Sequence, residues 1–94
     1  MQEKTGQRLI LADGTRIEDG AAGYADGFLW CYLQGLSMME VGALFFDPTK
    51  TSEIIFEYGE MQDVYHGMTQ CRIIRMDTDG QVAVCMAKGD ETDV

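Results

Sequence analysis

The residues best suited to catalysis in this chain are one histidine and three cysteines. His66 is the only imidazole, and the thiols are Cys31, Cys71 and Cys85. A cysteine nucleophile needs a base that holds it as a thiolate, so His66 would have to serve one of these thiols, with Asp63 orienting its ring. All three cysteines lie in apolar segments, where cysteine is usually an inert buried residue. We therefore expect no enzyme, and a thiol enzyme is the third-ranked hypothesis.

Acidic side chains are concentrated in one segment. Glu53, Glu57, Glu60 and Asp63 lie within eleven residues, and Glu53 and Glu57 share one face of the expected strand. Paired carboxylates can hydrolyse glycosides, but that chemistry also needs a large cleft, for which 94 residues leave little room. A solvated sheet face is the better interpretation, because such charges also discourage strand edges from aggregating.

No pattern for a metal or nucleotide site is present. The acidic run at residues 77–80 fits a calcium loop only with Gly80 at the sixth position, and Arg75 and Met86 then stand where carboxylates are required. One histidine excludes multi-histidine sites, and the cysteines lack C-x-x-C spacing. No glycine run ends as a P-loop does. The sequence predicts no catalytic residue, no metal site and no cofactor.

The chain is strongly acidic. Its 16 Asp and Glu residues against 7 Lys and Arg residues give a formal net charge of -9, which repels phosphate groups and anionic lipids. Direct binding to nucleic acid or to a membrane is therefore disfavoured. The charge suits a basic protein partner or an acidic protein that imitates nucleic acid, and it also serves solubility alone.

The length of the chain indicates one domain, residues 1–94, and the lack of a signal or membrane segment leads us to expect it in the cytoplasm. Residues 1–7 carry no apolar signal segment and are expected to form a flexible arm, while residues 89–94 form an acidic tail. The longest apolar run, Phe28–Leu33, is six residues long, against roughly 20 for a membrane helix.

Two Asp-Gly pairs, at residues 13–14 and 79–80, predict β-hairpins. Such a pair suits a two-residue type I′ turn, because both turn positions need a positive φ. In the first hairpin that turn sets Ile10 opposite Ile17. In the second, a longer loop beginning at Asp77 would change the register.

One strand and one helix are expected between the hairpins. Phe28–Leu33 is apolar on both alternating faces, so both faces must be covered, and we expect this segment to be the central strand. Residues 19–27 before it, rich in Gly and Ala, predict a sharply bending connection. Ser37 and Glu40 have the spacing of a capping box, which predicts a helix over residues 38–46.

The rest of the chain predicts more strands. Glu53–Tyr58 alternates as a half-buried strand, and residues 63–76 read as one long strand with a bulge at Gly67. Short connections favour antiparallel neighbours. The expected fold is therefore α+β: a mainly antiparallel sheet of about six or seven strands with one short helix, either open or curled toward a small barrel, of which we prefer the open form.

Exposed tyrosines near strand ends and turns indicate an interaction surface, since tyrosine offers contact area at a small entropic cost. Together with the nearby acidic side chains, the expected surface consists of Tyr24, Tyr58, Tyr65, Glu53, Glu57 and Glu60.

Three segments carry a resemblance. Leu9–Ile17, Ala22–Trp30 and Phe56–Glu60 look like small uncharacterised proteins of prophages and mobile elements of gut Firmicutes. The resemblance implies a phage structural or accessory role, in the cytoplasm or within a phage particle, and it transfers no functional residues. We therefore expect a non-enzymatic module that self-associates or binds a protein partner. The alternative is an acidic, nucleic-acid-mimicking inhibitor of a basic host protein.

Overall fold

The computed structural model describes residues 6–89. Residues 1–5 and 90–94 lie outside the described part, and with them most of the predicted arm (residues 1–7) and of the predicted tail (residues 89–94).

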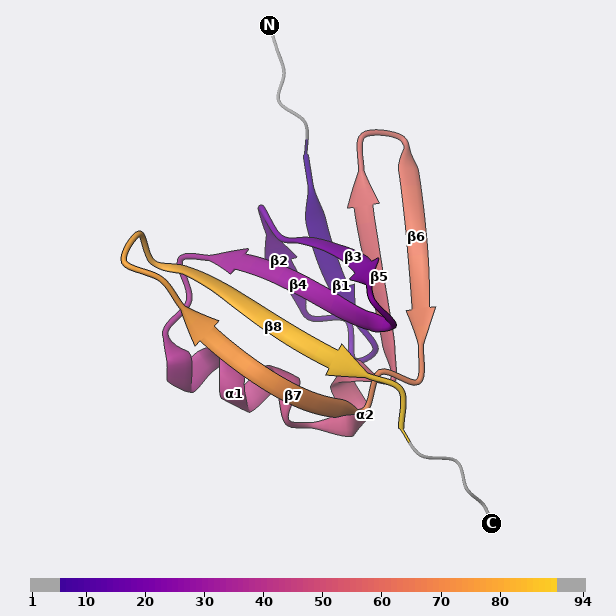
Figure 1. Cartoon of the computed structure of the whole chain (residues 1–94). Helices are drawn as coiled ribbons and strands as arrows, with labels where there is room; N and C mark the ends of the chain where they lie inside the picture. The colour runs from indigo at the N-terminus through magenta and orange to yellow at the C-terminus, as the bar shows by residue number, and fades with distance from the viewer. Residues whose placement is uncertain (1–5, 90–94) are drawn as a thin grey trace, which may run out of the picture.

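Within the described residues, eight strands form two antiparallel sheets of four strands each (Figure 1). The strands are β1 (Arg8–Leu11), β2 (Arg16–Glu18), β3 (Ala21–Ala25), β4 (Phe28–Gln34), β5 (Glu53–Tyr58), β6 (Met61–His66), β7 (Gln70–Met76) and β8 (Gln81–Ala87). Sheet A has the order β2-β1-β5-β6, and sheet B has the order β3-β4-β8-β7. The α+β class is confirmed, whereas the prediction of one sheet of six or seven strands, open or curled into a barrel, is wrong.

The chain changes sheet after the first hairpin, between β2 and β3. Asp19 has a φ of 62° and begins the change. Gly20 completes it in the core: a Cβ added there would lie 3.0 Å from Leu9 Cγ, closer than ordinary contact. Residues 19–27, predicted to be a connection, therefore bend only at their ends and form β3 between them.

A second change of sheet replaces the long strand predicted over residues 63–76. Gly67, with a φ of 74°, stands after β6. Its amide donates to the Ser52 carbonyl over 2.8 Å, and its carbonyl accepts the Gly89 amide over 2.9 Å. These bonds hold the crossing, so β6 belongs to sheet A and β7 to sheet B. Gly67 is a corner between sheets and not a bulge within one strand.

The first Asp-Gly hairpin has a three-residue loop. The Leu11 amide donates to the Thr15 carbonyl over 2.8 Å, and Gly14 is the only loop residue with a positive φ, 91°. A type I′ turn needs two positive φ angles, so the predicted turn is wrong. Ile17 consequently lies opposite Leu9, not opposite Ile10, and both side chains enter the core.

The second hairpin repeats this loop. The Asp77 amide donates to the Gln81 carbonyl over 3.0 Å, and Gly80 has a φ of 82°. Here the longer loop beginning at Asp77 is confirmed.

The predicted helix is present as α1 (Met38–Phe45). Ser37 Oγ accepts the Glu40 amide over 3.1 Å, and the Glu40 carboxylate accepts the Ser37 amide over 2.8 Å. A second helix, α2 (Pro48–Thr51), was not predicted; Asp47 caps it. Within residues 6–89, no helix is long and apolar enough to cross a membrane.

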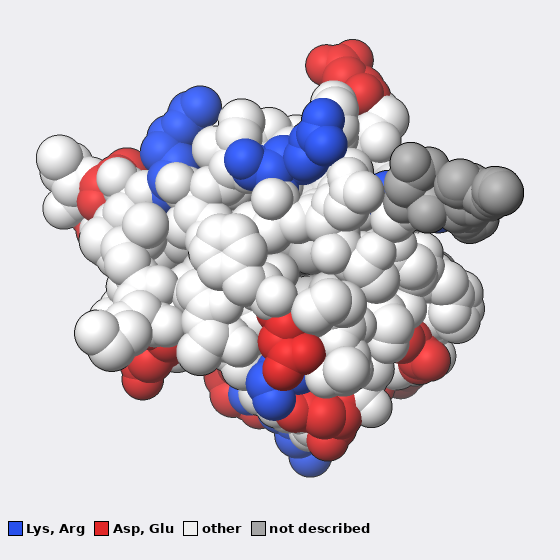
Figure 2. All heavy atoms as spheres, turned by 90° about the horizontal axis from the view of Figure 1, so that it is seen from below, with Lys and Arg blue, Asp and Glu red and all other residues white. Residues whose placement is uncertain are grey.

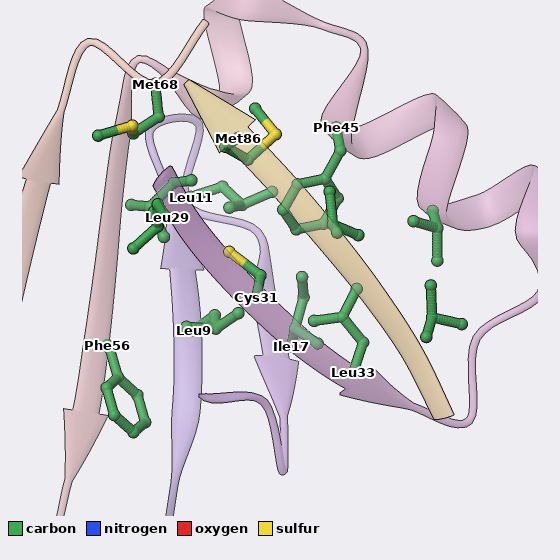
Figure 3. Packing of buried hydrophobic residues seen from close by; sticks show 14 residues of the cluster. Leu9, Leu11, Ile17, Leu29, Cys31, Leu33, Phe45, Phe56, Met68 and Met86 are labelled. Carbon is green, nitrogen blue, oxygen red and sulfur yellow. The ribbon is translucent and has the colours of Figure 1, made fainter. Parts of the chain in front are cut away.

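The core lies between sheet B on one side and sheet A with the helices on the other (Figures 1 and 3). In Figure 3, Phe45 of α1 points toward β8, and Met68, in the crossing from β6 to β7, closes one end of the cluster. The largest fully buried side chains are Phe45, Leu9, Leu29, Leu33, Ile54, Met68 and Met86.

The strand predicted to be central, β4, lies between β3 and β8. Leu29, Cys31 and Leu33 are buried in the core. The alternating face carries Phe28, Trp30 and Tyr32 and points away from sheet A. Within residues 6–89, only one of the two apolar faces of β4 is covered, whereas the sequence predicted a cover on both.

We expect Ser37→Ala to lower the free energy of unfolding by about 1 kcal/mol, because it removes the acceptor for an N-terminal amide of α1. Urea denaturation measures the change. Ser52→Ala is the control, since Ser52 is exposed and uses its backbone in the contacts described above. Equal losses in the two variants would contradict the capping role.

The Asp13 carboxylate makes the first hairpin sensitive to acid. It accepts the Thr15 amide and the Lys50 ammonium, each over 3.0 Å, and these contacts lower the pKa of Asp13 from 3.8 to about 2. Because the folded-state pKa lies below that of the unfolded chain, the stabilisation is complete above pH 3.8 and is lost as the pH falls to about 2.

We therefore expect Asp13→Ala to lower the Tm at neutral pH. The difference in Tm between the variant and the wild type should disappear as the pH falls from 3.8 to about 2. Asp79 occupies the same position in the second hairpin, and no hydrogen bond to its side chain is found within residues 6–89, so Asp79→Ala is the matched control. A gap that persists at pH 2 would contradict this role.

Candidate functional site

Three of the predicted surface tyrosines come together from both sheets. Tyr24 lies on β3 of sheet B, whereas Tyr58 and Tyr65 lie on β5 and β6 of sheet A. The rings of Tyr24 and Tyr65 meet edge to face, with centroids 5.2 Å apart and an interplanar angle of 80°. Phe56 stacks on Tyr58, with centroids 4.6 Å apart. We call Tyr24, Phe56, Tyr58, Tyr65 and Asp63 the tyrosine cluster.

Asp63 lies beside the rings of this cluster and binds one of them, Tyr58. It lies opposite Phe56 in the β5–β6 pairing, and its Oδ2 accepts the Tyr58 hydroxyl over 3.1 Å. This hydrogen bond is the main reason why the pKa of Tyr58 is raised. Burial, followed by the charge of Asp63, raises the pKa of Tyr65. Both phenols therefore remain neutral at physiological pH, beside a carboxylate.

The tyrosine cluster is an open surface. Tyr24 is 53% exposed, and Met61, which pairs with Tyr58 across the hairpin, is 61% exposed. Tyr58 and Tyr65 are half-buried against the core. No pocket is found in the part of the chain that the structure describes. The tyrosine cluster can therefore contact the surface of a partner through the edges and faces of its rings.

The predicted glutamates do not all join the tyrosines. Glu53 and Glu57 lie on the other face of sheet A, where Glu53 pairs with His66 and Glu57 Oε1 lies 3.4 Å from Arg8 Nη1. Glu60 lies in the turn between β5 and β6 and is exposed. The structure therefore groups the predicted aromatic residues and separates them from Glu53 and Glu57.

Sequence reasoning missed the parts played by Phe56 and Asp63. Alternation along β5 already set Phe56 on the same face as Tyr58. The turn at residues 59–60 is two residues long, and recognising it would have placed Asp63 opposite Phe56. From the sequence, Asp63 was assigned instead to the acidic segment with Glu53, Glu57 and Glu60 and to a place beside His66.

The thiols lie in a different sheet from the histidine. Cys31, Cys71 and Cys85 are on β4, β7 and β8 of sheet B, whereas His66 is exposed on β6 of sheet A. Burial raises the pKa of Cys31 to about 12 and also raises the pKa of Cys71, the opposite of what activates a nucleophile. Among residues 6–89, no group of three or more His, Cys, Asp or Glu side chains is placed to hold a metal ion.

The chain matches no known protein family, no curated protein and no solved structure. What the tyrosine cluster can do follows from its own side chains.

We expect Asp63→Asn to lower the pKa of Tyr58, because it removes the negative charge that opposes ionisation of the phenol. A spectrophotometric titration measures phenolate formation, and the same titration of Tyr58→Phe identifies the contribution of Tyr58. In the wild type, the Tyr58–Asp63 bond stabilises the fold below the ordinary tyrosine pKa of 10.0 and is lost as the pH rises through the raised value. An unchanged titration curve in Asp63→Asn would contradict the coupling.

Proposed function

We propose that this chain is a non-enzymatic interaction module that binds a basic protein segment through the tyrosine cluster. The observation that carries the proposal is the convergence of Tyr24, Tyr58 and Tyr65 from three strands and two sheets. Preformed aromatic clusters suit protein interfaces, because their large contact area is already ordered before binding.

The chemistry of the cluster favours a cationic side chain in the partner. An arginine or lysine side chain gains from contact with the face of an aromatic ring, and Asp63 supplies a carboxylate beside the rings. A guanidinium group is the better fit, since it stacks on rings and donates to carboxylates at once. The net charge of -9 attracts basic partners over a longer range.

The alternative, an acidic mimic of nucleic acid, has less support because it needs carboxylates along one ridge. Asp13 and Asp47 both lie beside Lys50, and Glu18 and Glu57 flank Arg8. Figure 2 shows acidic side chains at several separate places around a largely uncharged surface. The phage origin implied by the resemblance remains a prediction, which the genes adjacent to this one would test.

The proposal is tested by NMR titration with a short arginine peptide and with the same peptide carrying citrulline, which has nearly the same shape without the charge. We expect the ring signals of Tyr24, Tyr58 and Tyr65 to shift with the arginine peptide alone. Tyr24→Ser should weaken binding about threefold to fivefold, as expected for one cation–π contact.

Tyr32→Ser is the matched control, since Tyr32 is 41% exposed and lies outside the cluster. Binding of the citrulline peptide with the same affinity would contradict the cationic partner. Equal weakening by Tyr24→Ser and Tyr32→Ser would contradict the site.

A further inference from the structure

The outer face of sheet B is largely apolar, and no helix or strand within residues 6–89 covers it. On β4 it carries Phe28, Trp30 and Tyr32, and on β8 it carries Ala83, Cys85 and Ala87. In Figure 1 no helix or strand lies in front of β4 and β8. The charged side chains of this face among the described residues are two arginines of β7, Arg75 at a paired outward position and Arg72 at the bulge between Cys71 and Ile73.

The outer face of sheet A shows what a solvated face of this chain looks like. Arg8 lies at one end of this face, 3.5 Å from Glu18 Oε1 and 3.4 Å from Glu57 Oε1, whereas Ile10, Ile55 and Val64 form an apolar row across its middle. Arg16 is exposed on the same face. A chain with 16 acidic residues places none at the paired outward positions of sheet B, so the absence of acidic residues is particular to that sheet.

The side chains on the outer face of sheet B pack against one another, as the burial of Cys85 indicates. It is 3% exposed but lies outside the core cluster, on the opposite side of sheet B from Val84 and Met86. Its neighbours in register are Trp30 and Ile73, one on each side. Neighbouring side chains on this face therefore shield the thiol, and they leave an apolar surface above it.

We propose that the outer face of sheet B is the contact surface for a second copy of this chain, with a two-fold axis parallel to the strands between β4 and β8. The outward side chains Phe28, Trp30 and Tyr32 of β4 are large, and we call this row the ridge; Ala83, Cys85 and Ala87 of β8 are small, and we call this row the furrow. Rotation about that axis lays the β4 ridge of one copy over the β8 furrow of its partner, and the reverse. The surface is thus complementary to itself, as a two-fold interface requires.

In this two-fold arrangement, residues that are paired across β4 and β8 in one copy face the same pair of residues in the partner. Tyr32 and Ala83 are paired neighbours, as are Trp30 and Cys85. Because the axis is parallel to the strands, Tyr32 of one copy lies over the partner's Ala83, and Trp30 lies over the partner's Cys85. Sheets packed face to face in this aligned way stand about 10 Å apart, and large and small side chains fill the space between them.

Charge also favours a second copy at this face. Two chains of net charge -9 repel each other, so they approach most easily where neither presents a carboxylate. A basic partner would instead be drawn to the acidic surfaces elsewhere.

The area of the face sets the expected affinity. Four strands about 4.8 Å apart and up to seven residues long cover roughly 450 Å² per copy. A standard interface buries about 800 Å² per partner. We therefore expect a weak dimer that forms at about 10–100 μM and is strengthened by salt, which screens the repulsion between the two chains.

Sedimentation equilibrium of the full chain over a wide concentration range tests the dimer. Trp30 is the only tryptophan in the chain and is half-buried on this face, so its emission should shift to shorter wavelength over the same concentrations. A monomer at every concentration, or a dimer with unchanged emission, would overturn the proposal.

Two exchanges to glutamate locate the interface. Tyr32→Glu should weaken the dimer at least tenfold, because it places a carboxylate in the contact. Val64→Glu is the control, since Val64 is 39% exposed on the outer face of sheet A and should leave the dimer unchanged. Circular dichroism checks that both variants are folded. Equal effects would overturn the proposal.

Ala83→Phe distinguishes a self-complementary interface from nonspecific hydrophobic association. It makes the face more apolar but fills the furrow that receives the partner's Tyr32, so the dimer should weaken. Stronger association would overturn the two-fold arrangement. Tyr24→Ser changes the tyrosine cluster alone and should leave the dimer intact, so failure of the proposed function and failure of this inference are distinguishable.

Discussion

The close contact between Gly20 and Leu9 is the constraint on which the two-sheet arrangement depends. Leu9 is fully buried, and a Cβ on residue 20 would come within 3.0 Å of its side chain. A larger residue at position 20 would force the buried Leu9 side chain to shift as the backbone leaves β2 for β3. The crossing at Gly67 after β6 depends instead on a positive φ of 74° and on its bond to the Ser52 carbonyl, and Met68 fills the core beside it. Each hairpin can therefore lie in the opposite sheet from the one before it.

The two sheets divide the surface between different physical roles. Sheet A presents charged side chains to solvent, with Arg8 flanked by Glu18 and Glu57. Sheet B presents Trp30 and Tyr32 of β4, a strand that is apolar on both faces but that residues 6–89 cover on one face only. The tyrosine cluster lies where the inward faces of the two sheets meet solvent. Binding through the cluster and pairing through sheet B would therefore use separate surfaces of one small domain.

Local patterns in the sequence predicted the local structure well. The capping box of Ser37 and Glu40 and the alternation of Glu53–Tyr58 are both present as expected. The change of sheet could not be predicted, because Gly67 in a run of strand-forming residues suits a bulge as well as a corner. The choice depends on a distant partner, the Ser52 carbonyl. For the same reason the sequence identified three tyrosines for the surface, but not the way in which two sheets bring them together.

The strand order has a consequence for how the chain folds as it is made. β1 pairs with β5, and β4 pairs with β8, so each sheet joins two hairpins that are far apart in the sequence. The β3–β4 hairpin is synthesised early, with apolar side chains on both faces of β4, and its neighbour β8 emerges last of the eight strands. Until then β4 is an unpaired apolar edge of the kind that invites misassembly. The nascent chain is thus most vulnerable to aggregation in the interval between the synthesis of β4 and that of β8.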